Sequence, residues 1–155
     1  LGVDLRLFGS ATRLPLPRAS VDAIVCLYSL HHMVGETIGA TEAIVQQAFR
    51  EFRRVLTPTG CLLVFEVSPW WVVWGLQRCV WPLAKRALGP SLDVFFWHRD
   101  TLCRLAGPAW RLHEYRVLMA PAGVTFPFVA SVRRLRLPRA LYPFDVCLYQ
   151  WTPDQ

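Results

Sequence analysis

The hydrophobic positions between residues 20 and 70 predict a strand, a helix and a second strand. Asp22 leads the continuous apolar run Ala23–Leu27, which is too short for a lone helix and too uniform for a half-solvated strand. Such runs are typical of buried parallel strands, and Cys61–Val67 has the same pattern. Between them, apolar residues recur at steps of three and four, which predicts an amphipathic helix near Thr41–Leu56. Two buried strands joined by one helix form a βαβ unit, whose crossover is almost always right-handed.

The flanking segments predict further elements of the same domain. The helix is expected to stop at Thr57–Gly60, because proline cannot continue it and glycine tolerates the return turn. Pro82 is expected to kink or end an aromatic helix that Ser68 and Pro69 open. The other expected elements are a strand at Val3–Phe8 with a turn at Gly9–Ala11, a short helix from His98 or Asp100 to Leu105, strands at Trp110–Leu118 and Leu141–Trp151, and turns at Gly107–Pro108 and Ala120–Gly123.

Composition limits the class of protein. The 155 residues are 54% hydrophobic with a mean hydropathy of +0.30, so one folded domain is expected and disorder is not. The only apolar run before Ser10 contains Asp4 and Arg6, which argues against a signal peptide. Five cysteines are widely spread without a CxxC pair, which favours reduced thiols in a cytoplasmic protein over a disulfide framework or a metal site. Because the chain starts on Leu1, we expect it to be a fragment of a longer product.

The net charge of +6 raises the hypothesis of nucleic-acid binding. The dense basic cluster, Arg133–Arg139, lacks the interleaved aromatic residues of a single-strand binding platform. A solvated loop is therefore favoured over a nucleic-acid partner.

Three segments with fixed order and spacing carry a resemblance to a known family. A Leu14-Pro-Leu-Pro turn precedes the strand that Asp22 leads and that ends near His31-His32, and a helix then closes on Arg54-Val-Leu-Thr-Pro-Thr-Gly60 before a hydrophobic strand. This order resembles the middle of the class I S-adenosylmethionine-dependent methyltransferases. The resemblance implies an α/β fold with a Rossmann-like, mostly parallel sheet, helices on both faces and an antiparallel last strand. It also implies one incomplete domain over residues 1–155, with residues 68–107 as a helical insertion or lid.

The resemblance implies S-adenosylmethionine as the cofactor, although two of the family's features have no counterpart here. The glycine-rich loop after the first strand and the acidic residue that ends the second strand are absent, so the chain matches only about the last two thirds of the family fold and lacks its N-terminal βαβ part. The remaining cofactor contacts are expected at Gly9, Ser10 and Ala11, and at Leu27 and Tyr28. Ser10 stands where the family usually has an acid, and a neutral hydroxyl should contribute less than a carboxylate. Thr59 replaces the first glycine of the family's Pro-Gly-Gly turn, which should change the turn locally.

Candidate catalytic residues lie where the ligand of an open α/β sheet is expected, beyond the carboxyl ends of the strands. His31 and His32 are candidates for a base, because histidine titrates near neutral pH and methyl transfer to a hydroxyl or amine requires removal of a proton. Alternatively, one histidine packs beneath the loop and the other faces water. Glu66 is either a functional carboxylate or a structural one at a strand end.

The tryptophans between Trp70 and Trp81 leave three interpretations open: a lid over a greasy pocket, ordinary core packing, or an interfacial membrane helix with Arg78, Lys85 and Arg86 near anionic lipid. The leading functional hypothesis is methyl transfer to a small apolar acceptor that is lipid-like or quinone-like. The alternatives are a non-catalytic module that binds a partner chain at an open sheet edge, and a peripheral membrane protein.

Overall fold

The computed structural model describes residues 8–118 and 144–154. The elements follow the chain as β1 (Val21–Leu27), η1 (Leu30–His32), α1 (Ile38–Val55), β2 (Leu56–Pro69), α2 (Trp71–Leu88), η2 (Gly89–Ser91), α3 (Arg99–Ala106), β3 (Trp110–Leu118) and β4 (Phe144–Pro153).

The four strands form one sheet in the order β1-β2-β4-β3. β1 and β2 are parallel neighbours joined through α1, so the expected βαβ unit is confirmed. β4 lies between β2 and β3 and runs antiparallel to both, which confirms the antiparallel last strand. Three of the four described strands, β1, β2 and β3, run in the same direction, in agreement with the expected mostly parallel sheet. Because β4 inserts between two strands that run the opposite way, the sheet is mixed.

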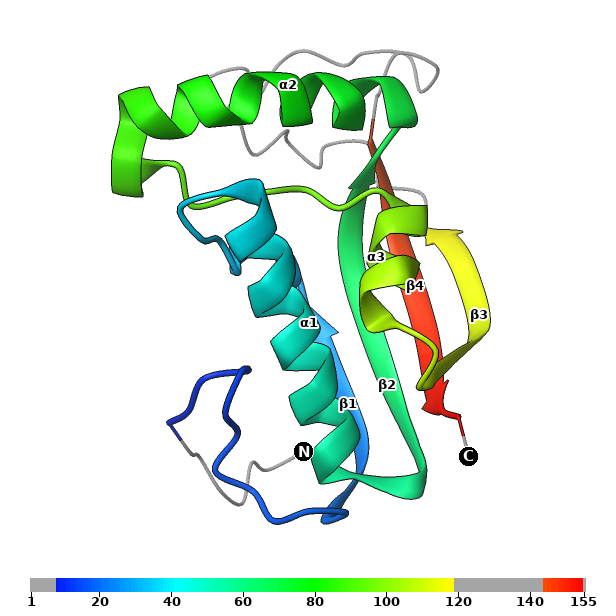
Figure 1. Cartoon of the computed structure of the whole chain (residues 1–155). Coiled ribbons are helices and arrows are strands. Elements are labelled where there is room, and N and C mark those ends of the chain that lie inside the picture. The colour runs from blue at the N-terminus through cyan, green and yellow to red at the C-terminus, as the bar shows by residue number, and fades with distance from the viewer. Residues whose placement is uncertain (1–7, 119–143, 155) are drawn as a thin grey trace.

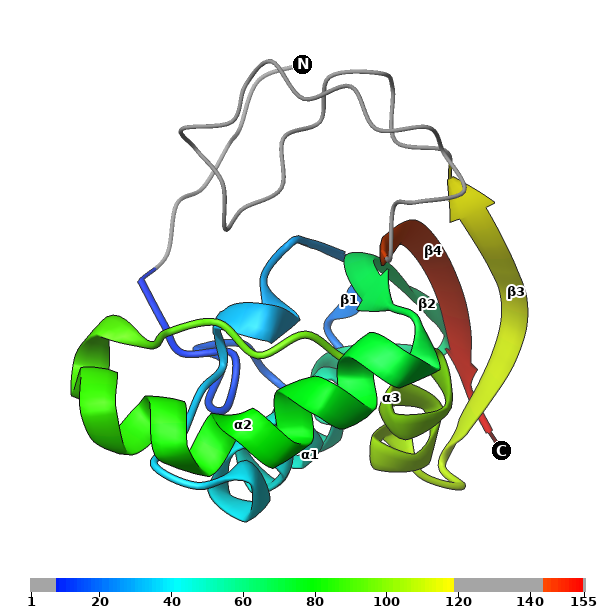
Figure 2. The same ribbon diagram turned by 90° about the horizontal axis from the view of Figure 1, so that it is seen from above.

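The helices lie on one side of the sheet rather than on both. Figures 1 and 2 show α1, α2 and α3 on the same side, with α2 running across the end of β2. α1 crosses from β1 to β2 over this face, and α3 packs against α1. On the other face, Val25 and Leu27 are 54% and 60% exposed. The expectation of helices on both faces was therefore wrong for the part of the chain that is described.

The core lies between this sheet and α1 with α3. The Phe49 ring at its centre makes edge contacts with Phe52, Trp110 and Trp151, at centroid distances of 6.2, 6.0 and 5.4 Å. Pairs with this geometry contribute about 0.5–1.5 kcal/mol each beyond their buried area. The apolar face predicted for α1 is thus the face that packs on the sheet.

Several boundaries differ from those expected. α1 begins three residues earlier than predicted, at Ile38, because the Thr37 hydroxyl caps it by accepting a hydrogen bond from the Ala40 N–H at 3.1 Å. α2 continues through Pro82 to Leu88, so the expectation that the proline could end the helix was wrong. His98 caps α3, its Nδ1 accepting from the Asp100 N–H at 3.4 Å.

Some predictions fall outside the described residues. These are most of the strand expected at Val3–Phe8, the turn at Ala120–Gly123, the cluster Arg133–Arg139 and the first residues of the strand expected from Leu141. Within the described ranges, no helix has both the length and the apolar character needed to cross a membrane.

Glycine is required at position 60 because other atoms lie too close for a side chain, and not because the residue has a positive φ. The glycines with positive φ in the described ranges are Gly89 and Gly107, whereas a Cβ on Gly60 would lie 3.0 Å from the Asp22 carbonyl oxygen and 2.9 Å from Leu56 Cδ2. The return from α1 into β2 therefore leaves no room for a side chain.

We expect Gly60→Ala to lower the free energy of unfolding by about 1–3 kcal/mol, because the contact with backbone oxygen can be relieved only by moving a strand. Gly39→Ala is the matched control, since a Cβ there meets only Thr37 Oγ1 at 4.0 Å and alanine favours the helix by up to about 1 kcal/mol. Urea titration of both variants measures the difference. Equal free energies of unfolding for the two variants would contradict the steric requirement for glycine at position 60.

Candidate functional site

Glu66 and His31 form a buried pair where β1 and β2 end. Glu66 is 1% exposed, and its Oε1 accepts a hydrogen bond from the Leu30 N–H at 2.7 Å. Its Oε2 lies 2.6 Å from Nδ1 of His31, which is 8% exposed. An ionised carboxylate can only accept, so the proton of this contact belongs to Nδ1. In a neutral imidazole, Nε2 then carries the lone pair and can act as a base.

The turn that carries His31 is held by the segment before α3. The Phe95 N–H donates to the His31 carbonyl oxygen at 2.8 Å, and Trp97 Nε1 donates to the Leu30 carbonyl oxygen at 3.2 Å. The Phe96 ring lies 5.4 Å from the imidazole, between centroids. These contacts hold the backbone of Leu30 and His31 in place. The orientation of the imidazole is therefore set both by the Glu66 carboxylate and by the fixed main chain of the turn.

His32 has a different environment from its neighbour. It is exposed, its ring lies 4.3 Å from that of His31, and its Nδ1 lies 3.4 Å from the Asp93 carbonyl oxygen. His31 is thus the buried member and His32 the exposed member of the two neighbouring histidines. Glu66 uses one oxygen for the Leu30 N–H and the other for His31 Nδ1, so it holds the η1 turn and orients the imidazole.

Leu27 and Tyr28 lie at the same end of the sheet as this pair. Leu27 is 60% and Tyr28 is 47% exposed, and the Tyr28 N–H donates to the Phe65 carbonyl oxygen at 2.9 Å. Tyr28 has φ of 48°, in the left-handed region that bulky residues rarely adopt. Backbone outliers of this kind cluster at functional sites, where surrounding structure holds them in place.

The loop of Gly9, Ser10 and Ala11 is placed against α1. Ser10 pairs with Arg13 in a tight turn, and its hydroxyl lies 2.8 Å from Thr12 Oγ1. Glu51 of α1 anchors the next residues by accepting from the Leu14 N–H at 2.9 Å. The hydrogen bonds of this turn in the described ranges are within itself and with α1, and none joins it to the His31–Glu66 pair.

Arg54 completes this anchor. Its guanidinium donates to Glu51 and to the carbonyl oxygens of Leu14 and Leu16, at 2.6, 3.1 and 2.9 Å. The hydrogen bond from this guanidinium, with that from the Leu14 N–H, holds the pKa of the Glu51 carboxyl below its usual range. Residues 14–16 are thereby fixed to α1 just before the chain enters β1.

The thiols near the site are poor nucleophiles. Burial raises the pKa of Cys26 from 9.0 to about 11; a hydrogen bond with Ser29 opposes this, and the nearby charge of Glu66 adds to it. All five cysteines are free, and Cys79 is the exposed one.

No group of three or more His, Cys, Asp and Glu side chains in the described ranges is arranged to hold a metal ion.

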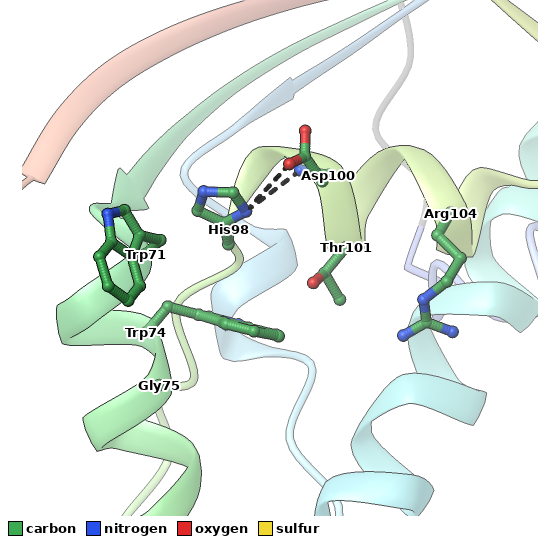
Figure 3. Close-up of a pocket in the computed structure, with 7 residues that line it drawn as sticks. All are labelled: Trp71, Trp74, Gly75, His98, Asp100, Thr101 and Arg104. Atoms are coloured by element: carbon green, nitrogen blue, oxygen red, sulfur yellow. Dashed lines mark hydrogen bonds and ion pairs between the residues drawn. The ribbon is translucent and has the colours of Figure 1, made fainter.

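A cavity of about 440 Å³ lies between α2 and α3. Figure 3 shows the indole rings of Trp71 and Trp74 on the α2 side, facing His98 and Thr101 at the start of α3. The remaining lining residues are Gly75, Asp100 and Arg104. The Arg78 guanidinium lies 4.9 Å from the centroid of the Trp74 ring. From the sequence, His98 was expected to be a surface or packing residue at the start of a short helix, and nothing in the pattern predicted that it would line a cavity.

The tryptophans divide between two environments. Trp81 is 3% exposed and packs on Phe95 with centroids 4.9 Å apart, as in the core interpretation. Trp70 and Trp71 are 43% and 74% exposed.

Gln77 connects α2 to the segment that holds His31. Its Nε2 donates to the Phe96 carbonyl oxygen at 2.9 Å, and its Oε1 accepts from the Phe96 N–H at 3.1 Å.

Comparison with known proteins relates this arrangement to one family. Residues 4–64 match the family model described as a methyltransferase domain. A search of the curated proteins gave no match.

Solved structures match over most of the chain. An S-adenosylmethionine-dependent methyltransferase from Methanosarcina mazei matches 94% of the chain with a TM-score of 0.61 and 14% identity. Geranyl diphosphate C-methyltransferase from Streptomyces coelicolor matches 94% with a TM-score of 0.60 and 14% identity. The (4+2)-cyclase SpnF matches 94% with a TM-score of 0.54 and 18% identity.

The chain spans only 65%, 52% and 54% of these three solved chains, respectively. At these identities the likeness concerns the fold, and the family match comes from residues 4–64. The resemblance to the class I S-adenosylmethionine-dependent methyltransferases is thus confirmed, in sequence over residues 4–64 and in fold over most of the chain.

Proposed function

We propose that a protein containing this chain transfers the methyl group of S-adenosylmethionine to a small apolar acceptor, with His31 as the base. The observation that supports this most is the buried Glu66–His31 pair at the carboxyl ends of β1 and β2, where ligands of open α/β sheets bind. Glu66 orients the imidazole, and Nε2 of His31 takes the proton of the acceptor hydroxyl or amine as the methyl group is transferred.

The residues present can supply one side of a cofactor site. Leu27 and Tyr28 offer an exposed aliphatic and aromatic pair at the strand end, on which an adenine ring can pack. The bound cofactor supplies an activated methyl group on a good leaving group, so alignment and proton removal are left to the protein. A glycine-rich loop for the methionine end has no counterpart in the 155 residues.

The proposal of an apolar acceptor is supported by the cavity between α2 and α3. Trp71 and Trp74 line one side of it, and α2 is tied through Gln77 to the segment that contacts His31. In this proposal residues 68–107 form the acceptor side of the site. The S. coelicolor enzyme with the same fold is described as acting on geranyl diphosphate, which has an apolar chain. A lipid-like or quinone-like acceptor is consistent with these aromatic walls.

The alternative function is a non-catalytic module, and the exposed face of β1 favours it specifically. Val25 and Leu27 lie on β1 and leave apolar surface exposed on one face of the sheet. β1 is also an edge strand, because only β2 pairs with it among the described residues. Such an edge pairs readily with another chain.

Calorimetric titration with S-adenosylhomocysteine distinguishes the two. We expect binding by the chain extended upstream in its reading frame and little or none by the 155 residues alone, because the missing contacts are those to the methionine end. Absence of binding by both forms, each shown to be folded by circular dichroism, would contradict the methyltransferase proposal and favour the interaction module.

A further inference from the structure

The outer side of α2 carries a continuous apolar stripe. Val72, Leu76, Val80 and Leu83 are 56%, 63%, 48% and 73% exposed, and they recur at steps of three and four residues. Cys79, which is also exposed, lies within the same stripe. Residues at this spacing share one face of a helix, so they form a single ridge along most of α2.

The stripe is separate from the face with which α2 packs on the protein. Trp81 and Lys85 are the buried residues of this helix, and Gln77 bonds to the segment before α3. These three residues lie on the opposite side of the helix from the stripe. Core packing therefore accounts for one face of α2 and leaves the second apolar face unexplained.

The charges on α2 are all positive. The helix contains Arg78, Lys85 and Arg86, and no Asp or Glu. Arg78 shares the Glu42 carboxylate with Arg104, at 3.3 and 3.1 Å, so one acid balances two cations. Lys85 donates to the Leu92 carbonyl oxygen at 3.2 Å, and neither it nor Arg86 has a carboxylate partner among the described residues. Lys85 is buried on the opposite side of α2, so the exposed cation beside the stripe is Arg86, three residues after Leu83 and on the same face of the helix.

The width of the stripe argues against a second copy of the chain as its occupant. A stable protein interface buries about 800 Å² on each partner. The stripe is a single row of five side chains on one helix, whereas each partner of such an interface contributes roughly 20–30 residues. A bilayer surface needs no such area, because an interfacial helix gains from apolar insertion and from anionic headgroups together.

We propose that α2 docks on the surface of a membrane that contains anionic lipid. The stripe lies at the boundary between headgroups and acyl chains, Trp71 sits at the interface as tryptophan does in peripheral proteins, and Arg86 contacts the headgroups. Trp71 also lines the cavity between α2 and α3, so a docked membrane would lie beside the proposed acceptor site. That last consequence rests on the proposed function, whereas docking itself does not.

Flotation with lipid vesicles, without cofactor, tests the docking. We expect the chain to float with vesicles of phosphatidylcholine and phosphatidylserine and much less with phosphatidylcholine alone. The double variant Leu76→Gln, Leu83→Gln should reduce the partition coefficient at least about tenfold, since two leucines no longer insert. Val117→Gln is the matched control, because Val117 is 43% exposed and lies on β3 rather than on α2, and its replacement should leave flotation unchanged.

A dye on Cys79 gives a second measurement that does not depend on the folding of a variant. Cys79 is the exposed cysteine, Cys61 is only partly exposed, and burial raises the pKa of the Cys26, Cys103 and Cys147 thiols, so Cys79 is expected to label first. Its emission should shift to the blue with anionic vesicles. No flotation and no shift would overturn the proposal, as would equal loss in the Val117 variant. Self-association of the chain that the double variant abolishes would instead identify a second copy as the occupant and would equally overturn it.

Discussion

Replacement of His31 by glutamine is expected to lower kcat of methyl transfer by about 10²–10⁴-fold, the usual contribution of a general base. Glu66 Oε2 fixes the proton of the imidazole on Nδ1, so Nε2 is the atom that can accept a proton from the acceptor. Glutamine has similar polarity but cannot take that proton near neutral pH. The affinity for S-adenosylhomocysteine should change little, because the proposed cofactor contacts are at other residues.

Formation of S-adenosylhomocysteine measures this effect in the upstream-extended form, with a panel of phenol and quinol acceptors carrying apolar chains.

His32→Gln is the matched control for this experiment. His32 is adjacent in sequence but exposed, and its Nδ1 contacts only the Asp93 carbonyl oxygen, at 3.4 Å. We expect kcat close to that of the unsubstituted protein. A loss in His32→Gln that exceeds the loss in His31→Gln would exchange the roles of the two histidines, and unchanged kcat in both would remove the base from the mechanism.

The local elements were predictable because their signals are local. The apolar runs at Ala23–Leu27 and Cys61–Val67 and the repeat in α1 indicate one βαβ unit, which the structure contains. The order of the sheet depends instead on β4, which joins β2 and β3 by pairing Leu62 with Trp151 and Leu112 with Trp151. No local pattern encodes pairing over such distances along the chain, so the position of β4 between β2 and β3 was not predicted.

The site was predictable only as a region. Strand ends meet at one edge of a parallel pair, so the sequence alone predicts that His31, His32 and Glu66 lie near one another. The pattern could not show that Glu66 bonds both the Leu30 N–H and His31, because that depends on the turn η1. The cavity between α2 and α3 was missed, since Trp74 and His98 come from two elements whose contact arises only in the folded chain.

The largest expected effect on stability is at Glu66. Glu66→Leu fills the space with an apolar side chain but leaves the Leu30 N–H and His31 Nδ1 without an acceptor in a buried place. Each unsatisfied buried group costs about 1–3 kcal/mol, so we expect the free energy of unfolding to fall by about 2–5 kcal/mol. Glu114→Leu is the control, because Glu114 lies on β3 in a surface ion pair with Arg116, and such pairs contribute at most about 1 kcal/mol.

Glu66→Gln separates the positioning role of this carboxylate from its structural one. The amide oxygen can still accept from the Leu30 N–H, so the loss of stability should be only about 1–2 kcal/mol. The amide nitrogen then faces His31 Nδ1 as a donor, which forces the imidazole proton onto Nε2 and removes the proposed base. We therefore expect kcat to fall toward that of His31→Gln, and ¹⁵N spectra to show the change of tautomer. A stable Glu66→Gln protein with full activity would show that Glu66 only supports the fold and that Nε2 of His31 is not the proton acceptor.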